Sequence, residues 1–90
     1  MKTLRIIIKG TVQGIFFRKF IEEKANELGV RGYCRNLDNG AVEVVIEGRD
    51  EKVNELVQEC KKGPKQAQIM DVQVEELKHQ GLEGFKIFKM

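Results

Sequence analysis

The chain has 90 residues, with 16 Lys and Arg against 14 Asp and Glu and a formal net charge of +2 at pH 7. This length predicts a single domain, covering residues 1–90, near the lower size limit for folding on one core without metals or disulfides. The small charge argues against broad attraction to nucleic acids or membranes, and without an apolar stretch of ~20 residues we expect a cytoplasmic protein.

The first predicted elements are a strand and a helix joined by a glycine-bearing loop. Residues 4–8 (Leu-Arg-Ile-Ile-Ile) alternate weakly and predict a strand that is buried on at least one face. After it, Gly10 and Gly14 allow a tight backbone turn that directs several N–H groups at one spot. The helix is expected to begin at Arg18, because apolar residues follow at helical spacing, and to stop at Gly29.

This loop and Arg18 together predict an anion-binding site. A helix N-terminus and a guanidinium group both favour negative charge, and the expected anion is a phosphoryl group. Taken alone, Arg18 also fits an exposed helix arginine, and two glycines four residues apart recur by chance.

Two further strands follow and form a predicted hairpin. They cover residues 31–35 and 41–47, and residues 36–40 connect them. The Asn-Gly pair of this connection is expected to supply the positive φ angles of a tight reversal. In the second strand, Val42, Val44 and Ile46 share one face, and Glu43 and Glu47 lie on the other.

The second half of the chain predicts one helix and two strands. Asp50 is a favourable N-cap, and Gly63 and Pro64 end the helix. Residues 70–74 alternate as a fourth strand, and residues 85–88 form a short closing strand. The apolar stripe of the helix contains Val53, Leu56, Val57 and Cys60.

The order of the elements predicts the fold. Two helices with one apolar stripe each can cover only one face of a sheet. We therefore predict an α+β fold, a ferredoxin-like βαββαβ sandwich with an antiparallel sheet of four to five strands and two helices on one face. Because this architecture hosts enzymes, regulatory domains and RNA-binding proteins, the site residues must decide the function.

Missing residue types narrow the chemistry. The chain has no serine, which excludes a serine nucleophile and a Walker-type phosphate loop. The only histidine, His79, lies in a predicted turn and is better explained as a solvated residue than as a catalytic base. Cys34 and Cys60 match no zinc-site spacing and are expected to be reduced, buried thiols, although the sequence leaves open a disulfide between them.

Two stretches of the chain resemble the acylphosphatase family. Residues 8–18 (Ile-Lys-Gly-Thr-Val-Gln-Gly-Ile-Phe-Phe-Arg) are similar to its phosphate-loop signature. Residues 32–36 (Gly-Tyr-Cys-Arg-Asn), followed by Gly40, Val42 and Gly48, are similar to its second signature. The resemblance spans the whole predicted domain.

The resemblance implies that the protein hydrolyses the carboxyl–phosphate anhydride of acyl phosphates without a metal or other cofactor. It identifies Arg18 as the phosphate-binding catalytic arginine and Asn36 as the residue that orients the attacking water. The expected partner is a small-molecule acyl phosphate, with no nucleic acid or membrane partner, and the protein is expected to be a monomer. Besides Arg18, the predicted substrate-binding residues hold the phosphoryl oxygens mainly through backbone N–H groups: Gln13, Gly14, Ile15, Phe16 and Phe17.

Several alternatives accompany this prediction. Asn36 also fits the role of a plain turn residue. The side chains of Phe16, Phe17 and Phe20 are expected to anchor the core rather than contact substrate, although the sequence leaves open an outward orientation for Phe16. An RNA-binding domain of the same fold would carry exposed aromatic residues on its third strand, whereas this strand carries Glu43 and no aromatic residue. A non-catalytic phosphometabolite sensor would need the loop but not a water-orienting amide.

Overall fold

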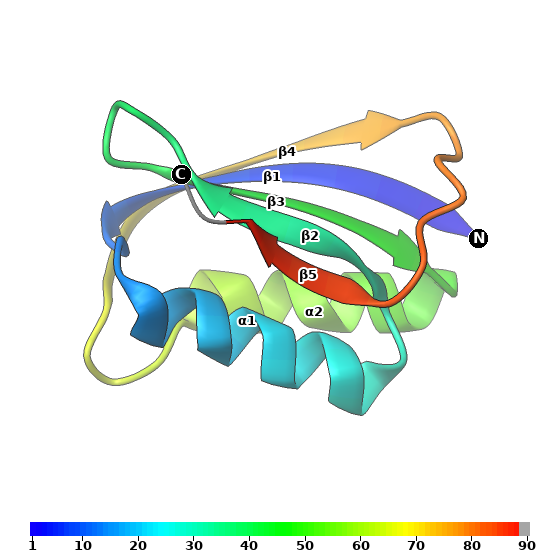
Figure 1. Cartoon of the computed structure of the whole chain (residues 1–90), viewed down its shortest axis with the longest axis horizontal. Coiled ribbons are helices and arrows are strands. Elements are labelled where there is room, and N and C mark those ends of the chain that lie inside the picture. Colours follow the sequence, from blue (N-terminus) through cyan, green and yellow to red (C-terminus); the bar gives the residue numbers. More distant parts are fainter. Residues whose placement is uncertain (89–90) are drawn as a thin grey trace.

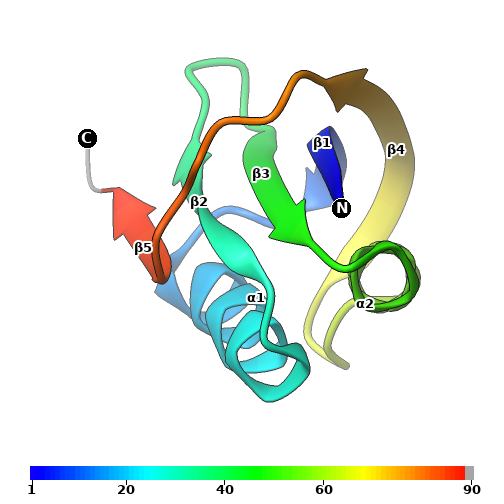
Figure 2. The ribbon, with the colours of Figure 1, turned by 90° about the vertical axis from the view of Figure 1, so that its right-hand side faces the viewer.

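A computed structural model describes residues 1–88, apart from the side chain of Ile15, and contains one five-stranded sheet and two helices. The helices lie side by side on one face of the sheet (Figures 1 and 2). This arrangement confirms the predicted ferredoxin-like α+β fold. In chain order the elements are β1 (Lys2–Thr11), α1 (Ile15–Leu28), β2 (Arg31–Asn36), β3 (Val42–Gly48), α2 (Asp50–Lys62), β4 (Gln68–Leu77) and β5 (Phe85–Phe88).

The strands lie in the order β4-β1-β3-β2-β5. The first four strands pair antiparallel, as predicted, but β5 is parallel to β2, which makes the sheet mixed. The reason is the connection over residues 78–84, which crosses the open face of the sheet from β4 to the opposite edge (Figure 2). It delivers the chain to the end at which β2 begins, where the Gly32 N–H donates to the carbonyl of Gly84 at 2.8 Å.

The core lies between the sheet and the helices. The α1 helix packs on β2 and β5, and α2 packs on β1, β3 and β4. Both predicted helical stripes are confirmed, because Phe17, Ile21 and Ala25 of α1 are fully buried and the four stripe residues of α2 are also buried. The α1 helix begins at Ile15, three residues before the predicted start. No helix within residues 1–88 is long and apolar enough to cross a membrane.

Two local predictions at element ends are wrong. The N-cap of α2 is Arg49, not Asp50, and no side chain caps this helix within residues 1–88. Asp50 instead occupies the first helical position and lies 3.4 Å from the amino group of Met1. In the hairpin, Gly40 alone has a positive φ (91°), because Asn39 uses its side-chain Oδ1 to accept the Ala41 N–H at 3.1 Å.

The two cysteines are free thiols, as expected. Cys34 on β2 and Cys60 on α2 are both fully buried in the core and form no disulfide. Burial raises the pKa of each thiol to about 12, and for Cys34 the positive charge of Arg18 partly opposes this rise. Neither thiol therefore carries a useful thiolate fraction near neutral pH.

Glu47 is the most deeply buried charged residue, and it ties the 78–84 connection to the sheet. Its carboxylate is fully inaccessible and accepts hydrogen bonds from the Thr3 hydroxyl at 2.5 Å, the Gln80 N–H at 2.6 Å and the Leu82 N–H at 2.9 Å. His79 is largely exposed, as predicted, but its Nδ1 lies 3.2 Å from the same carboxylate. Burial alone would raise the pKa of Glu47, but these hydrogen bonds outweigh it and lower the pKa to about 2.

Replacement of Glu47 by glutamine is expected to remove stability at neutral pH but not at low pH. A folded-state pKa of about 2, below the ordinary 4.5, stabilises the fold above pH 4.5, and this contribution disappears as the pH falls toward 2. The shift corresponds to about 3 kcal/mol of unfolding free energy. Urea unfolding between pH 7 and 2 measures it, and the gap between wild type and Glu47→Gln should narrow below pH 5.

The matched control is Glu83→Gln, which neutralises an exposed carboxylate in the same connection. We expect its unfolding free energy to follow wild type at every pH. If the Glu47→Gln gap stayed constant down to pH 2, the carboxylate charge would not be the source of the stability.

Candidate active site

The loop between β1 and α1 is built around Gly14. This residue is the N-cap of α1, and its φ of 117° and ψ of 161° lie in a region that side chains strongly disfavour. Gly10, the other predicted loop glycine, lies inside β1 at a bulge against β4. A Cβ atom at Gly10 would collide with the carbonyl oxygen of Gln68, so this glycine serves the close packing of two strands.

The N-terminus of α1 offers unpaired backbone donors. The first turn of a helix has N–H groups without intrahelical acceptors. Within residues 1–88 no side chain caps α1, and its first turn carries no acidic residue. The positive end of the helix dipole is therefore available to an anion from outside the protein.

Arg18 lies in this first turn and is half-buried. Its Nη1 donates to the carbonyl of Phe88 at 3.2 Å, so the last described residue of β5 holds one arm of the guanidinium group. Its Nε is buried and has no hydrogen-bond partner among the described residues. An unsatisfied buried donor is costly, which favours a ligand that supplies an oxygen atom at this position.

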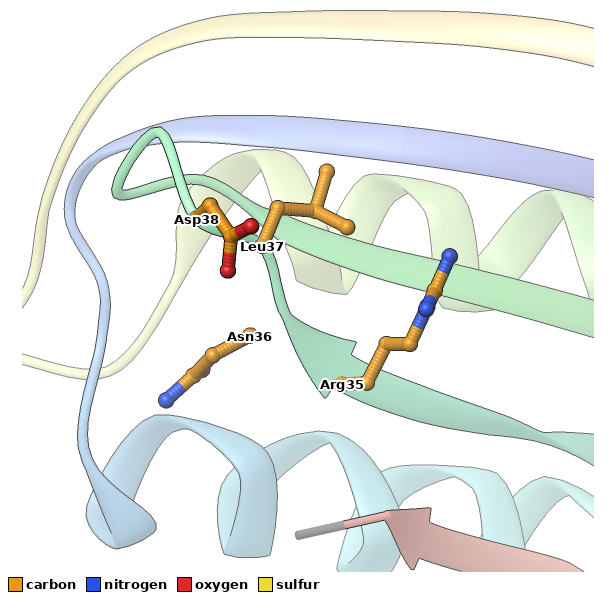
Figure 3. Close-up of a pocket in the computed structure, with 4 residues that line it drawn as sticks. All are labelled: Arg35, Asn36, Leu37 and Asp38. Atoms are coloured by element: carbon orange, nitrogen blue, oxygen red, sulfur yellow. The ribbon is translucent and has the colours of Figure 1, made fainter. Parts of the chain in front are cut away.

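Asn36 is the last residue of β2, at the same end of the sheet as the N-terminus of α1 (Figure 1). Its side chain lies on the strand face that carries the buried Cys34, the face toward α1. The Oδ1 of Asn36 is buried and has no partner within residues 1–88. A pocket of about 200 Å³ adjoins this side chain, and Figure 3 shows the four residues that line it: Arg35, Asn36, Leu37 and Asp38.

Arg35, the neighbour of Asn36, is held away from the α1 side. Figure 3 shows the two side chains leaving β2 in different directions. The Nε of Arg35 lies 2.6 Å from the carboxylate of Glu43, which also accepts the Nε of Arg5 at 2.5 Å. Burial alone would raise the pKa of Glu43, but these two guanidinium groups hold it below its ordinary value. Arg35 is thus committed to an ion pair on the open face of the sheet.

The side chain of Gln13 joins the loop to the hairpin. Its Nε2 donates to the carbonyl of Leu37 at 2.8 Å and to the carbonyl of Ala41 at 3.2 Å. Sequence reasoning missed this side chain, because it considered only the backbone N–H of Gln13. A backbone carbonyl acceptor leaves no signal in the residue type that carries it, so the pattern of the sequence offered no way to find the contact.

The predicted phenylalanines differ in their environment. Phe17 is fully buried and Phe20 packs against the core, which confirms both as core residues. For Phe16 the sequence favoured a core position and left an outward orientation open, and the structure shows the outward one, because this residue is 37% exposed. Its ring lies near Gly14, so that a Cβ at Gly14 would come within 3.4 Å of it. The reason is the earlier helix start, which puts Phe16 in the first turn beside the loop.

The chain is similar to known proteins over nearly its whole length. The acylphosphatase family model matches residues 4–87. A relative named acylphosphatase from Haloquadratum walsbyi is 43% identical over 82 residues, which are 91% of this chain and 88% of the relative. Another of the same name from Caldivirga maquilingensis is 44% identical over 88 residues, or 97% and 90% of the two chains. The crystal structure of acylphosphatase from Bacillus subtilis superposes with a TM-score of 0.93 and 32% identity, covering 98% of this chain and 99% of that chain.

Proposed function

Because this chain belongs to the acylphosphatase family, we propose that it hydrolyses the carboxyl–phosphate bond of acyl phosphates to a carboxylate and inorganic phosphate without a metal ion. The observation that carries the proposal is a pair of buried polar atoms that have no hydrogen-bond partner within residues 1–88, Nε of Arg18 and Oδ1 of Asn36. They flank the uncapped N-terminus of α1 at one end of the sheet. Each group remains available for a substrate or a water molecule.

The leaving group determines which catalytic groups are needed. An acyl phosphate releases a carboxylate, whose conjugate acid has a pKa of about 4, so the leaving oxygen needs no proton at neutral pH. The reaction can therefore proceed without a general acid. A mechanism without a general acid suits this chain, because its one histidine, His79, belongs to the 78–84 connection. That connection lies away from the loop between β1 and α1 (Figure 1).

The remaining requirement is to bind the phosphoryl oxygens and to stabilise their charge as the bond breaks. We assign this role to Arg18 and to the backbone N–H groups across residues 13–17. The guanidinium group is permanently charged and planar, so it can hold two phosphoryl oxygens at once. The helix N-terminus adds donors that are already oriented before the substrate arrives.

We assign to Asn36 the orientation of the attacking water. An amide both donates and accepts, so it can fix a water molecule without adding charge to the site. It is a poor base, and the proton of the water therefore passes to a phosphate oxygen of the substrate itself. A pH profile with an essential enzyme group titrating near neutrality would argue against this route.

Every assigned group lies on this chain, so we also propose that residues 1–90 work as one domain and as a monomer.

Phosphate release from acetyl phosphate in the presence of a chelator tests the proposed function. We expect one inorganic phosphate per acetyl phosphate, at the same rate with and without EDTA. Glycerol phosphate is the matched control, because its alkoxide leaving group needs a proton that this site does not supply. No release above the buffer rate, or a rate that EDTA abolishes and Mg²⁺ restores, would overturn the proposal.

A further inference from the structure

The side chain of Gln13 connects two segments that are far apart in the sequence. Its two hydrogen bonds, to the carbonyls of Leu37 at 2.8 Å and Ala41 at 3.2 Å, span 24 and 28 residues. Because both acceptors are carbonyl oxygens, only the NH₂ end of the amide can satisfy them. The orientation of the amide is therefore fixed by its partners.

These two carbonyls are also the ones that close the hairpin turn. The Leu37 N–H donates to the carbonyl of Ala41 at 2.8 Å, and the Gly40 N–H donates to the carbonyl of Leu37 at 3.1 Å. Each oxygen has two lone pairs, so Gln13 takes the second acceptor position of each. The link thus holds the two hydrogen-bonded carbonyls that define the turn, at residues 37 and 41, rather than the residues at its tip.

The link ends next to both halves of the site. Gln13 directly precedes Gly14, the N-cap from which the anion-binding turn of α1 starts, and Leu37 directly follows Asn36. We propose that Gln13 is a positioning residue that sets the distance between the phosphate-binding loop and the water-orienting Asn36. This inference rests on the proposed function, since it assigns to Gln13 a role in that same reaction.

The proposal predicts a specific kinetic effect. In-line attack requires the water and the phosphorus atom to be about 3–3.5 Å apart, and a misplacement of about 1 Å costs on the order of 10²-fold in rate. Loss of the link leaves the N–H groups of the loop and Arg18 in place, so phosphate affinity is retained. We therefore expect about a 10- to 100-fold lower kcat and a phosphate inhibition constant within about threefold of wild type.

Two variants of Gln13 and one control test the link. Gln13→Met keeps the length of the side chain but removes both donors, and Gln13→Glu places a carboxylate against two carbonyl oxygens. Gln58→Met is the matched control, because it makes the same change at an exposed glutamine on α2. We expect kcat to fall in both Gln13 variants and to stay at the wild-type value in the control.

A double-mutant cycle with Asn36→Ala separates positioning from a general loss of structure. If Gln13 acts through Asn36, Gln13→Met should lower kcat much less in the Asn36→Ala background than in the wild-type background. Amide hydrogen exchange at Gly40 supplies a readout besides activity, and it should be faster in Gln13→Met than in wild type.

The outcomes of these experiments distinguish the two proposals. Wild-type protein that releases no phosphate would overturn the proposed function and the positioning role with it. If wild type is active, two results would overturn the positioning role alone. One is a Gln13→Met variant with unchanged kcat, and the other is a double variant whose loss in kcat equals the product of the two single losses.

Discussion

Replacement of Arg18 by glutamine is expected to lower kcat/KM for acetyl phosphate by about 10²–10⁴-fold, the range for a preorganised donor that stabilises transition-state charge. Glutamine retains an NH₂ group with two donor hydrogens but loses the permanent charge and the planar fork of the guanidinium group. It also vacates the hydrogen bond to the carbonyl of Phe88, at the edge of the sheet. Because that bond is exposed, we expect the unfolding free energy to change by less than about 1.5 kcal/mol.

Two further variants define this experiment. Lys19→Gln removes one positive charge from the adjacent, exposed position of α1 and should leave kcat/KM within a fewfold of wild type. Arg18→Lys keeps the charge but not the two-oxygen geometry, so its activity should lie between those of wild type and Arg18→Gln. Steady-state kinetics on acetyl and benzoyl phosphate measure the effect. Near-normal turnover by Arg18→Gln would contradict the assignment of Arg18 to the active site.

The second large effect is expected at Asn36. The Asn36→Ala variant should lose about 10²–10³-fold in kcat, as when a single catalytic amide is removed, with little change in KM or in inhibition by phosphate. The side-chain Oδ1 has no partner within residues 1–88, so its removal breaks no described hydrogen bond at that atom. We therefore expect the thermal midpoint to stay close to that of wild type.

Asn54→Ala serves as the control for Asn36→Ala, because it also removes an asparagine side chain. Asn54 is exposed on α2 and accepts a hydrogen bond from Lys2 at the start of β1, so it is not part of the candidate site. The kcat of this control should equal that of wild type. A pattern in which Asn36→Ala raised KM and left kcat unchanged would assign Asn36 to substrate binding instead of to the water.

The sequence allowed the layers of the fold to be predicted because each layer depends on local periodicity. The stripe of α2 is apolar at helical spacing and is buried as a unit. The two wrong predictions, at the start of α2 and in the 36–40 connection, concern positions where neighbouring residues compete for the same local role. Asp50 and Asn39 both have side chains that suit the predicted roles. However, Arg49 is the extended residue before α2, which places Asp50 inside the helix. In the hairpin, the Asn39 side chain accepts the Ala41 N–H.

The candidate site could be predicted only in part for a related reason. Arg18 and Asn36 belong to short motifs with fixed residue types, which a single sequence displays directly. The hydrogen bonds that hold the site together are not displayed by residue type in this way. Gln13 binds backbone carbonyls 24 and 28 residues away, and Arg18 binds a carbonyl 70 residues away, and every residue type offers the same acceptor. Only the folded topology brings such partners together.

The hydrogen bond between Arg18 and the carbonyl of Phe88 has a consequence for the time course of folding. It joins the first helix to the last strand, and β1 lies between β3 and β4, which both follow it much later in the chain. Native contacts of such long sequence separation require large loops to close first, which slows folding. During synthesis, a nascent chain therefore holds most of its core residues before Phe88 is present to accept the hydrogen bond from Arg18. The hydrogen bond from Arg18 can form only once β5 pairs with β2 at the edge of the sheet, because Phe88 lies opposite Arg35 in that pairing.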